Sequence, residues 1–177
     1  MRALLGVALC ALGLLAACAT LTEEECRTGN WFDIGVEDGA NGRLPGFLAS
    51  HAEACADLGI TPDRVAWEKG RQTGLPQYCT PARAYDVGRR GRDLSPVCPV
   101  GQLPALESAN ARGQEWHRIT KRILDLEDDI RDINAELRSL ETGDEARALS
   151  LRSDRQFLRL RILGLEAERR RVATPQA

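Results

Sequence analysis

The chain has 177 residues, of which 28% are charged, and its 24 basic residues nearly balance its 26 acidic residues. The resulting net charge of −2 gives no global field that would favour nucleic acid or a membrane surface as a partner. The length fits one modest domain with an appendage, and no second apolar stretch follows the first residues, which excludes a multi-span membrane protein.

The first eighteen residues determine the compartment that we expect. Arg2 precedes an apolar run over residues 3–17, which is shorter than the roughly 20 residues that a membrane helix needs and is typical of an export signal. The run ends in Leu15-Ala16-Ala17-Cys18, which resembles the lipobox of bacterial lipoproteins. We therefore expect a signal peptide over residues 1–17 and lipid attachment to Cys18. An ordinary signal peptide is the alternative, because Ala17-Cys18-Ala19 also offers a small-x-small cleavage site.

The number of cysteines supports lipid attachment. Cys10 leaves with the signal, and the cysteines that remain are Cys18, Cys26, Cys55, Cys79 and Cys98. Five is an odd number, and an unpaired thiol is a liability in an oxidising compartment. If Cys18 carries lipid, the other four can pair completely. We favour Cys26 with Cys55 and Cys79 with Cys98, although four cysteines allow three pairings.

Residues 18–100 are expected to form a small helical domain that depends on its disulfides. This segment is poor in large apolar residues, and each native disulfide contributes about 2 to 5 kcal/mol to a domain of this size. Thr61-Pro62 and Thr80-Pro81 each combine an N-cap residue with proline at the first helical position, which predicts helices over 62–75 and 81–92. A further helix is expected over 46–58, before Gly59.

An aromatic residue followed three positions later by glycine occurs in three copies in this domain. The copies are Phe32/Gly35/Gly39, Trp67/Gly70/Gly74 and Tyr85/Gly88/Gly91, the last glycine coming one position early. On a helix these positions share one face. Because an interior glycine costs a helix about 1 kcal/mol relative to alanine, we expect the glycines to allow close packing of a neighbouring backbone. The alternative is a shallow platform for a sugar ring or peptide, formed by Trp31, Trp67, Gly70, Gly74, Tyr85 and Gly88.

These residues also carry a family resemblance. Their order is Cys26, Trp31, Gly35, Asp38-Gly39, Cys55, Trp67-x-x-Gly70-Arg71, Gly74, Tyr78-Cys79, Tyr85-x-x-Gly88 and Cys98. Behind a lipobox, this order resembles a family of small proteobacterial lipoproteins catalogued as domain of unknown function 2799. The resemblance covers Cys18 to about Cys98, with Trp67 at a position where the family pattern suggests tyrosine. It implies no activity and no catalytic residues.

The C-terminal part predicts a helical hairpin. After an expected linker over 101–114, the apolar residues Trp116, Ile119, Ile123, Leu126, Ile130, Ile133, Leu137 and Leu140 form an a/d seam. Thr142-Gly143-Asp144 interrupts the pattern, and a second helix continues with Leu151, Leu158, Leu165 and Val172. We expect an antiparallel coiled-coil hairpin over 115–172 and a disordered tail over 173–177. Arg155 and Arg169 fall at seam positions, so an intermolecular coiled coil is the alternative, and the oligomeric state stays open.

Together these features predict an all-α lipoprotein of structural or adaptor type on the periplasmic face of the outer membrane. Its expected partners are the membrane, through the lipid, and an envelope protein or the cell wall; a glycan- or peptidoglycan-binding module is the alternative. We expect no cofactor and no metal, because a disulfide is the better use of Cys55 than a metal pair with His51. We expect no enzyme, because Glu37, Asp38 and His51 come without a motif for a nucleophile or an oxyanion donor.

Overall fold

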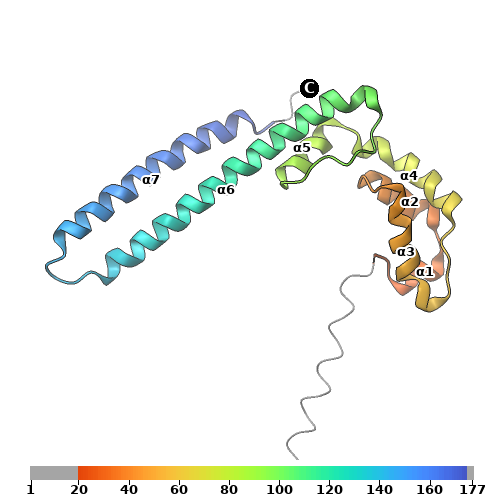
Figure 1. The fold of residues 1–177 in the computed structure, drawn as a ribbon, viewed down its shortest axis with the longest axis horizontal. Helices are drawn as coiled ribbons and strands as arrows, with labels where there is room; N and C mark the ends of the chain where they lie inside the picture. The colour runs from red at the N-terminus through yellow and green to blue at the C-terminus, as the bar shows by residue number, and fades with distance from the viewer. Residues whose placement is uncertain (1–19, 175–177) are drawn as a thin grey trace, which may run out of the picture. The chain divides into compact units, whose positions relative to one another are not determined.

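A computed structural model describes residues 20–174 of the chain. The α-helices are α1 (Glu23–Thr28), α2 (Trp31–Ala40), α3 (Leu48–Ala54), α4 (Arg64–Tyr78), α5 (Pro81–Arg89), α6 (Leu103–Ser139) and α7 (Glu145–Arg171) (Figure 1). Short 3-10 turns lie at η1 (Pro45–Phe47), η2 (Ala56–Leu58) and η3 (Val100–Gln102). Residues 20–174 contain no strand, so the predicted all-α class is confirmed. The expected signal peptide and Cys18 lie outside the described residues.

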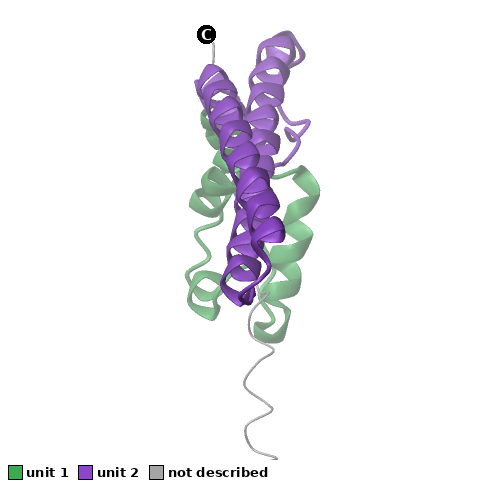
Figure 2. Ribbon diagram, turned by 90° about the vertical axis from the view of Figure 1, so that its left-hand side faces the viewer, with its two compact units in different colours: residues 1–78 green, residues 79–177 purple. Residues whose placement is uncertain are grey.

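The chain divides into two compact units between Tyr78 and Cys79 (Figure 2). This boundary differs from the one expected near residue 100, because the segment from Cys79 to Cys98 packs with α6. The expected linker over 101–114 is also replaced, since α6 already begins at Leu103. Pro104 occupies the first turn of α6, where proline loses no intrahelical hydrogen bond.

In unit 1, α2 and α4 pack through glycines on both helices. A Cβ added at Gly35 or Gly39 would overlap a backbone carbonyl oxygen of α4, and a Cβ added at Gly70 or Gly74 would overlap one of α2. The two backbones therefore lie in direct contact at these four positions. The predicted close packing is confirmed for both copies, although the ring of Phe32 is partly exposed and the neighbouring Trp31 is buried instead.

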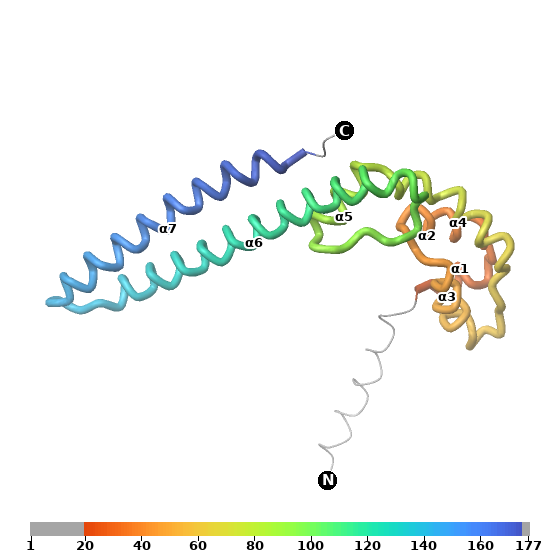
Figure 3. Tube along the Cα trace, turned by 45° about the horizontal axis from the view of Figure 1, so that its top comes forward, coloured from red at the N-terminus to blue at the C-terminus, as the bar shows by residue number. Residues whose placement is uncertain are grey.

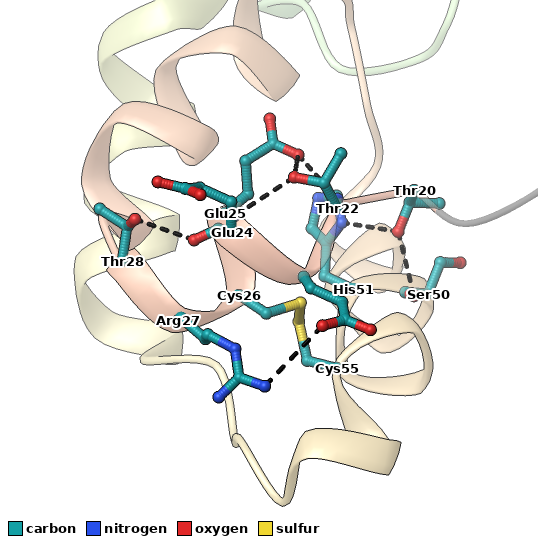
Figure 4. Close-up of a disulfide and its surroundings, with 11 residues drawn as sticks. Thr20, Thr22, Glu24, Glu25, Cys26, Arg27, Thr28, Ser50, His51 and Cys55 are labelled. Carbon is teal, nitrogen blue, oxygen red and sulfur yellow. Dashed lines mark hydrogen bonds and ion pairs between the residues drawn. A yellow bond between two sulfur atoms is a disulfide. The ribbon is translucent and has the colours of Figure 1, made fainter.

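The start of unit 1 is held by the first disulfide. Cys26 in α1 pairs with Cys55 after α3, with 5.6 Å between the two Cα atoms (Figure 4). Both cysteines belong to one buried cluster with Leu21, Trp31 and Trp67. Thr22 and Glu25 form a capping box at the N-terminus of α1. The favoured pairing of Cys26 with Cys55 is confirmed.

The two Thr-Pro pairs behave differently at their helix starts. The hydroxyl of Thr80 accepts a hydrogen bond from the Arg83 N–H at 3.2 Å, and α5 begins at Pro81 as predicted. In contrast, α4 begins at Arg64, and a carboxylate oxygen of Asp63 accepts from the N–H groups of residues 65 and 66. Asp63 takes the capping role expected of Thr61, because its carboxylate can reach two donors at once.

Unit 2 contains the same kind of glycine contact, between α5 and the part of α6 that was expected to be a linker. Gly88 of α5 lies against the backbone of α6 at Asn110, and Gly113 of α6 lies against the backbone of α5 at Tyr85. The side-chain amide of Asn110 donates to the Ala84 carbonyl at 3.0 Å. The second disulfide, Cys79–Cys98, closes the segment that carries α5, which confirms the other favoured pairing.

Helices α6 and α7 run side by side in opposite directions and are joined by a short loop, so they form an antiparallel hairpin (Figures 1 and 3). Seam residues Ile119, Ile123, Leu126 and Leu151 are buried. Gly143 in the loop has a φ of 115°, which a residue with a side chain rarely adopts. Arg155, which falls at a seam position, is accommodated because its guanidinium donates to the side-chain oxygen of Asn134 at 2.7 Å.

The end of α7 is tied back to the first part of unit 2. The Tyr85 hydroxyl donates to the Val172 carbonyl at 2.8 Å, and the Arg112 guanidinium donates to the Thr174 carbonyl at 3.1 Å. Burial raises the pKa of Tyr85, so its hydroxyl keeps the proton that it donates. The first two residues of the expected tail are thus held by hydrogen bonds, and residues 175–177 lie outside the described part.

The glycine contacts predict opposite effects of the same substitution at two positions. Gly70→Ala places a methyl group inside the α4–α2 contact and should lower the free energy of unfolding by about 1 to 3 kcal/mol. Gly164→Ala in α7, where nothing lies within 4 Å of the added Cβ, should raise it by up to about 1 kcal/mol. Urea unfolding followed by tryptophan fluorescence and circular dichroism measures both. A neutral or stabilising Gly70→Ala would contradict the packing interpretation.

A polar network around Asp38 and His51

The most strongly constrained polar groups of unit 1 surround Asp38 and His51, two residues that are only 7% and 2% exposed. One carboxylate oxygen of Asp38 accepts from the Trp67 indole N–H at 2.8 Å and lies 2.7 Å from Nε2 of His51. The other ring nitrogen of His51, Nδ1, lies 2.9 Å from the Thr20 hydroxyl (Figure 4). That hydroxyl also reaches the Ser50 carbonyl oxygen at 3.1 Å.

Four separate segments of unit 1 bring these groups together. Asp38 comes from α2, His51 from α3 and Trp67 from α4, while Thr20 precedes α1. The glycine contact explains why the indole of α4 reaches a carboxylate of α2, because Gly39 next to Asp38 lets the two backbones approach. A buried carboxylate is tolerated only when hydrogen bonds replace its hydration, and Asp38 obtains them from two rings.

The proton count of the network constrains how it is connected. The hydroxyl of Thr20 has one proton, so it can donate either to His51 or to the Ser50 carbonyl. When Thr20 donates to Ser50, its oxygen accepts from Nδ1 of His51, and Nε2 of His51 faces Asp38. The network therefore joins the start of the described chain to the interior of unit 1 through a single imidazole.

A cavity of about 200 Å³ lies beside this network. Its lining consists of Thr20, Leu21, Glu25, Ile34, Glu37, Asp38, Asn41, Arg43, Phe47 and His51. The Arg43 guanidinium stacks 4.1 Å above the Phe47 ring, and the other ionisable groups of the lining are mostly acidic. The cavity is smaller than the roughly 300 to 1,000 Å³ of typical small-molecule sites, so it suits water or a small ion better than a substrate.

The order carboxylate, imidazole, hydroxyl is also that of a hydrolase triad, in which the hydroxyl would be the nucleophile. A nucleophilic hydroxyl works beside hydrogen-bond donors that stabilise the oxyanion formed in the reaction. The Thr20 hydroxyl instead lies 3.1 Å from the carbonyl oxygen of Ser50, which would repel an oxyanion. We therefore interpret the network as a clamp on the N-terminal segment.

A second buried polar group in unit 1 is Arg71 of α4, for which the sequence alone predicted no role. Its guanidinium makes two hydrogen bonds of 2.8 Å to the Glu68 carboxylate and donates to the Arg43 carbonyl at 3.1 Å. The contact to Arg43 attaches the loop after α2 to α4. The hydrogen bonds from Arg71 hold the pKa of Glu68 below its ordinary value of 4.5.

The structure corrects the idea that the aromatic and glycine residues form a binding platform. Trp31, Trp67 and Tyr85 are at most 6% exposed, and Gly70, Gly74 and Gly88 are covered by the backbone of a neighbouring helix. Moreover, Tyr85 and Gly88 belong to unit 2, whereas the other four belong to unit 1. Aromatic and glycine residues on one helical face favour a helix contact but are also compatible with a ligand platform, and the neighbouring helix decides between the two.

Residues 30–115 match the sequence profile of a family described as a protein of unknown function, DUF2799. These residues are similar to that family. The matched segment runs from α2 into α6 and contains the glycine contacts of both units, the Asp38 network apart from Thr20, and three of the four disulfide cysteines. Cys26 and α7 lie outside it. No curated protein and no solved structure matches the chain.

The described residues show neither a metal site nor a membrane-spanning helix. Between residues 20 and 174, no group of three or more His, Cys, Asp or Glu side chains is arranged to hold a metal ion. Cys55, once considered as a metal partner of His51, is consumed by its disulfide. Within the same residues, no helix combines the length and the apolar character that crossing a membrane requires.

Removing the carboxylate of Asp38 tests the clamp. Asp38→Ala leaves the Trp67 and His51 donors buried without an acceptor and should lower the free energy of unfolding by about 3 kcal/mol. The matched control is Glu37→Ala, the exposed neighbour on α2, for which we expect a change within about 0.5 kcal/mol. Urea unfolding followed by tryptophan fluorescence measures both, and equal effects would contradict a special role of Asp38.

The pairing of Glu68 with Arg71 predicts a pH dependence of stability. Because the pKa of Glu68 is lower in the folded protein, its ion pair stabilises the fold above pH 4.5, and this contribution is lost as the pH falls through the folded pKa. In Glu68→Gln the melting temperature should therefore decline less in this acidic range than in the wild type. Glu53→Gln, an exposed change in the same unit, should keep the wild-type profile. Identical profiles for all three proteins would refute the assignment.

Proposed function

We propose that this protein is a lipoprotein of the cell envelope, of structural or adaptor type, tethered by lipid on Cys18 to the periplasmic face of the outer membrane. In this proposal it binds another envelope component, either a protein or the cell wall. The observation that carries the proposal is the docking of the segment directly after Cys18. Thr20 is bound to His51 and Ser50, and Leu21 is buried in the core cluster of unit 1.

The short connection has a mechanical consequence for a lipid-bearing Cys18. Only Ala19 lies between Cys18 and Thr20, and a fully extended chain spans about 3.5 Å for each of the two steps. Acyl chains on Cys18 would therefore hold Thr20, at the start of unit 1, within about 7 Å of the residue that carries the lipid. A long flexible tether would let the domain diffuse away from the bilayer, whereas this docked segment would keep it at the surface.

The disulfides support the same compartment. All four cysteines in residues 20–174 are paired, as Cys26–Cys55 and Cys79–Cys98. Structural disulfides persist in the periplasm and are rare in the reducing cytosol. Because Cys18 is the remaining cysteine after signal removal, lipid attachment would leave no free thiol in the mature chain.

The hairpin of unit 2 supports an adaptor role. Helix α7 has 27 residues and is about 40 Å long at 1.5 Å per residue, which gives a long surface for a partner. The glycan-binding alternative depended on the rings of Trp31, Trp67 and Tyr85, all of which are buried. We therefore do not extend the proposal to a glycan on that face.

Lipid attachment is tested at the two cysteines of the leader region. Cys18→Ser should move the protein from membranes that have been washed with high salt into the soluble fraction, because the acyl chains have no other attachment point and salt removes protein that is held only by its charges. Cys10→Ser, which changes a residue that leaves with the signal, should keep it in the membrane fraction. Mass spectrometry of the mature N-terminal peptide should show acylated Cys18. An unmodified N-terminus at Thr20 would overturn the proposal.

The adaptor role needs a separate experiment. A photo-cross-linking residue placed on the exposed hairpin surface should give a discrete product with one envelope protein in growing cells, and co-sedimentation with purified cell-wall sacculi tests the wall as the partner. Absence of both products would leave the lipid attachment intact and remove the adaptor role.

A further inference from the structure

Helix α7 has a second apolar face in addition to the seam that it presents to α6. Leu149, Phe157, Leu160 and Leu163 are between 59% and 65% exposed. At 100° per residue they fall within a sector of about 120°, opposite to the seam residues Leu151, Leu158 and Leu165. We call these four residues the outer face of α7. Surface apolar residues are common singly, but four on one helical stripe form a candidate contact surface.

The charges beside the outer face are mainly positive. Arg152, Arg159 and Arg161 are exposed along its two edges, and the acidic residue within the same stretch of helix is Asp154. Over its whole length α7 has eight arginines against four acidic residues, a net charge of +4. Helix α6 is different, with six basic residues against eight acidic ones, a net charge of −2.

This distribution selects among possible occupants of the outer face. Two copies of α7 packed on each other would bring two helices of net charge +4 together, which opposes self-association through this face. A helix with leucine and phenylalanine on one side and arginines along the edges is suited to the interface of an anionic bilayer. There the rings and aliphatic side chains enter the headgroup region, while arginine stems lie along it and keep their charges at the phosphates.

We propose that the outer face of α7 binds the surface of an anionic lipid bilayer. Leu149, Phe157, Leu160 and Leu163 insert at the level of the headgroups, and Arg152, Arg159 and Arg161 pair with lipid phosphates. The face of α6 that points away from the seam, with Lys121, Asp128 and Asp132, stays in water. This inference goes beyond the proposed function, because it does not require lipid on Cys18.

The test uses the chain from residue 19 onward, which contains every described element and has no lipidation site. Flotation with vesicles that contain phosphatidylglycerol should show binding, and vesicles of phosphatidylcholine alone should bind at least tenfold more weakly, because each arginine at an anionic surface contributes a factor of about five. Raising the salt concentration should weaken binding to the anionic vesicles. No binding to phosphatidylglycerol vesicles would overturn the proposal.

Matched substitutions locate the binding face. Leu160→Gln, and separately Leu163→Gln, should weaken vesicle binding roughly tenfold, because a leucine side chain that would enter the membrane is lost. The control is Leu124→Gln on α6, which is 54% exposed and should leave binding unchanged. Arg159→Gln should weaken binding about fivefold, and Lys121→Gln on α6 should not. All these side chains are exposed, so the far-ultraviolet circular dichroism should stay the same.

Two other results would contradict the lipid assignment. If Leu124→Gln weakens vesicle binding as much as Leu160→Gln, the outer face of α7 is not the contact. If the lipid-free protein dimerises in sedimentation experiments and Leu160→Gln abolishes that dimer, the outer face is occupied by a second copy. Lipid attachment at Cys18 is unaffected by either result, because the tested chain does not contain that residue.

Discussion

The structure depends on direct contact between helix backbones at positions without side chains. Gly35 and Gly39 on one helix meet Gly70 and Gly74 on the other in unit 1, and unit 2 uses the same device between α5 and α6. Each interior glycine weakens its own helix by about 1 kcal/mol, so the helices are stable only as packed pairs. Packing replaces intrinsic helix propensity as the reason why these segments are helical.

Such close contacts leave little room for a conventional core, and other interactions take its place. In unit 1 a disulfide joins α1 to the turn after α3, Asp38 accepts from rings of two different helices, and Arg71 attaches the loop after α2. The buried polar groups therefore fix which segments lie together, and the small apolar cluster around Trp67 supplies hydrophobic burial.

The hairpin follows a different rule, because its long helices carry ordinary leucine and isoleucine seams. The seam is closed within one chain, and a half-buried arginine on it, Arg155, is satisfied by Asn134. This leaves α7 with an apolar face on each side, one covered by α6 and one exposed with arginines beside it. Unit 2 covers only one of the two apolar faces of α7, and the other is exposed to solvent. For this reason we infer that the exposed face contacts a bilayer.

The sequence by itself determined the features that depend on local spacing. Proline after threonine at position 80, the glycine spacing and the heptad seam each act within a few turns of one helix. The tertiary structure decided which surfaces cover each other. The local sequence does not indicate that Gly113 packs in a helix contact, because its partner, Gly88, is 25 residues away. In the same way, the hydrogen bonds of Asp38 and His51 with Trp67 and Thr20 form only in the folded structure, because these residues are far apart in the chain. Helix periodicity specifies a face, but whether a ligand, solvent or another backbone covers that face depends on residues far away in the chain.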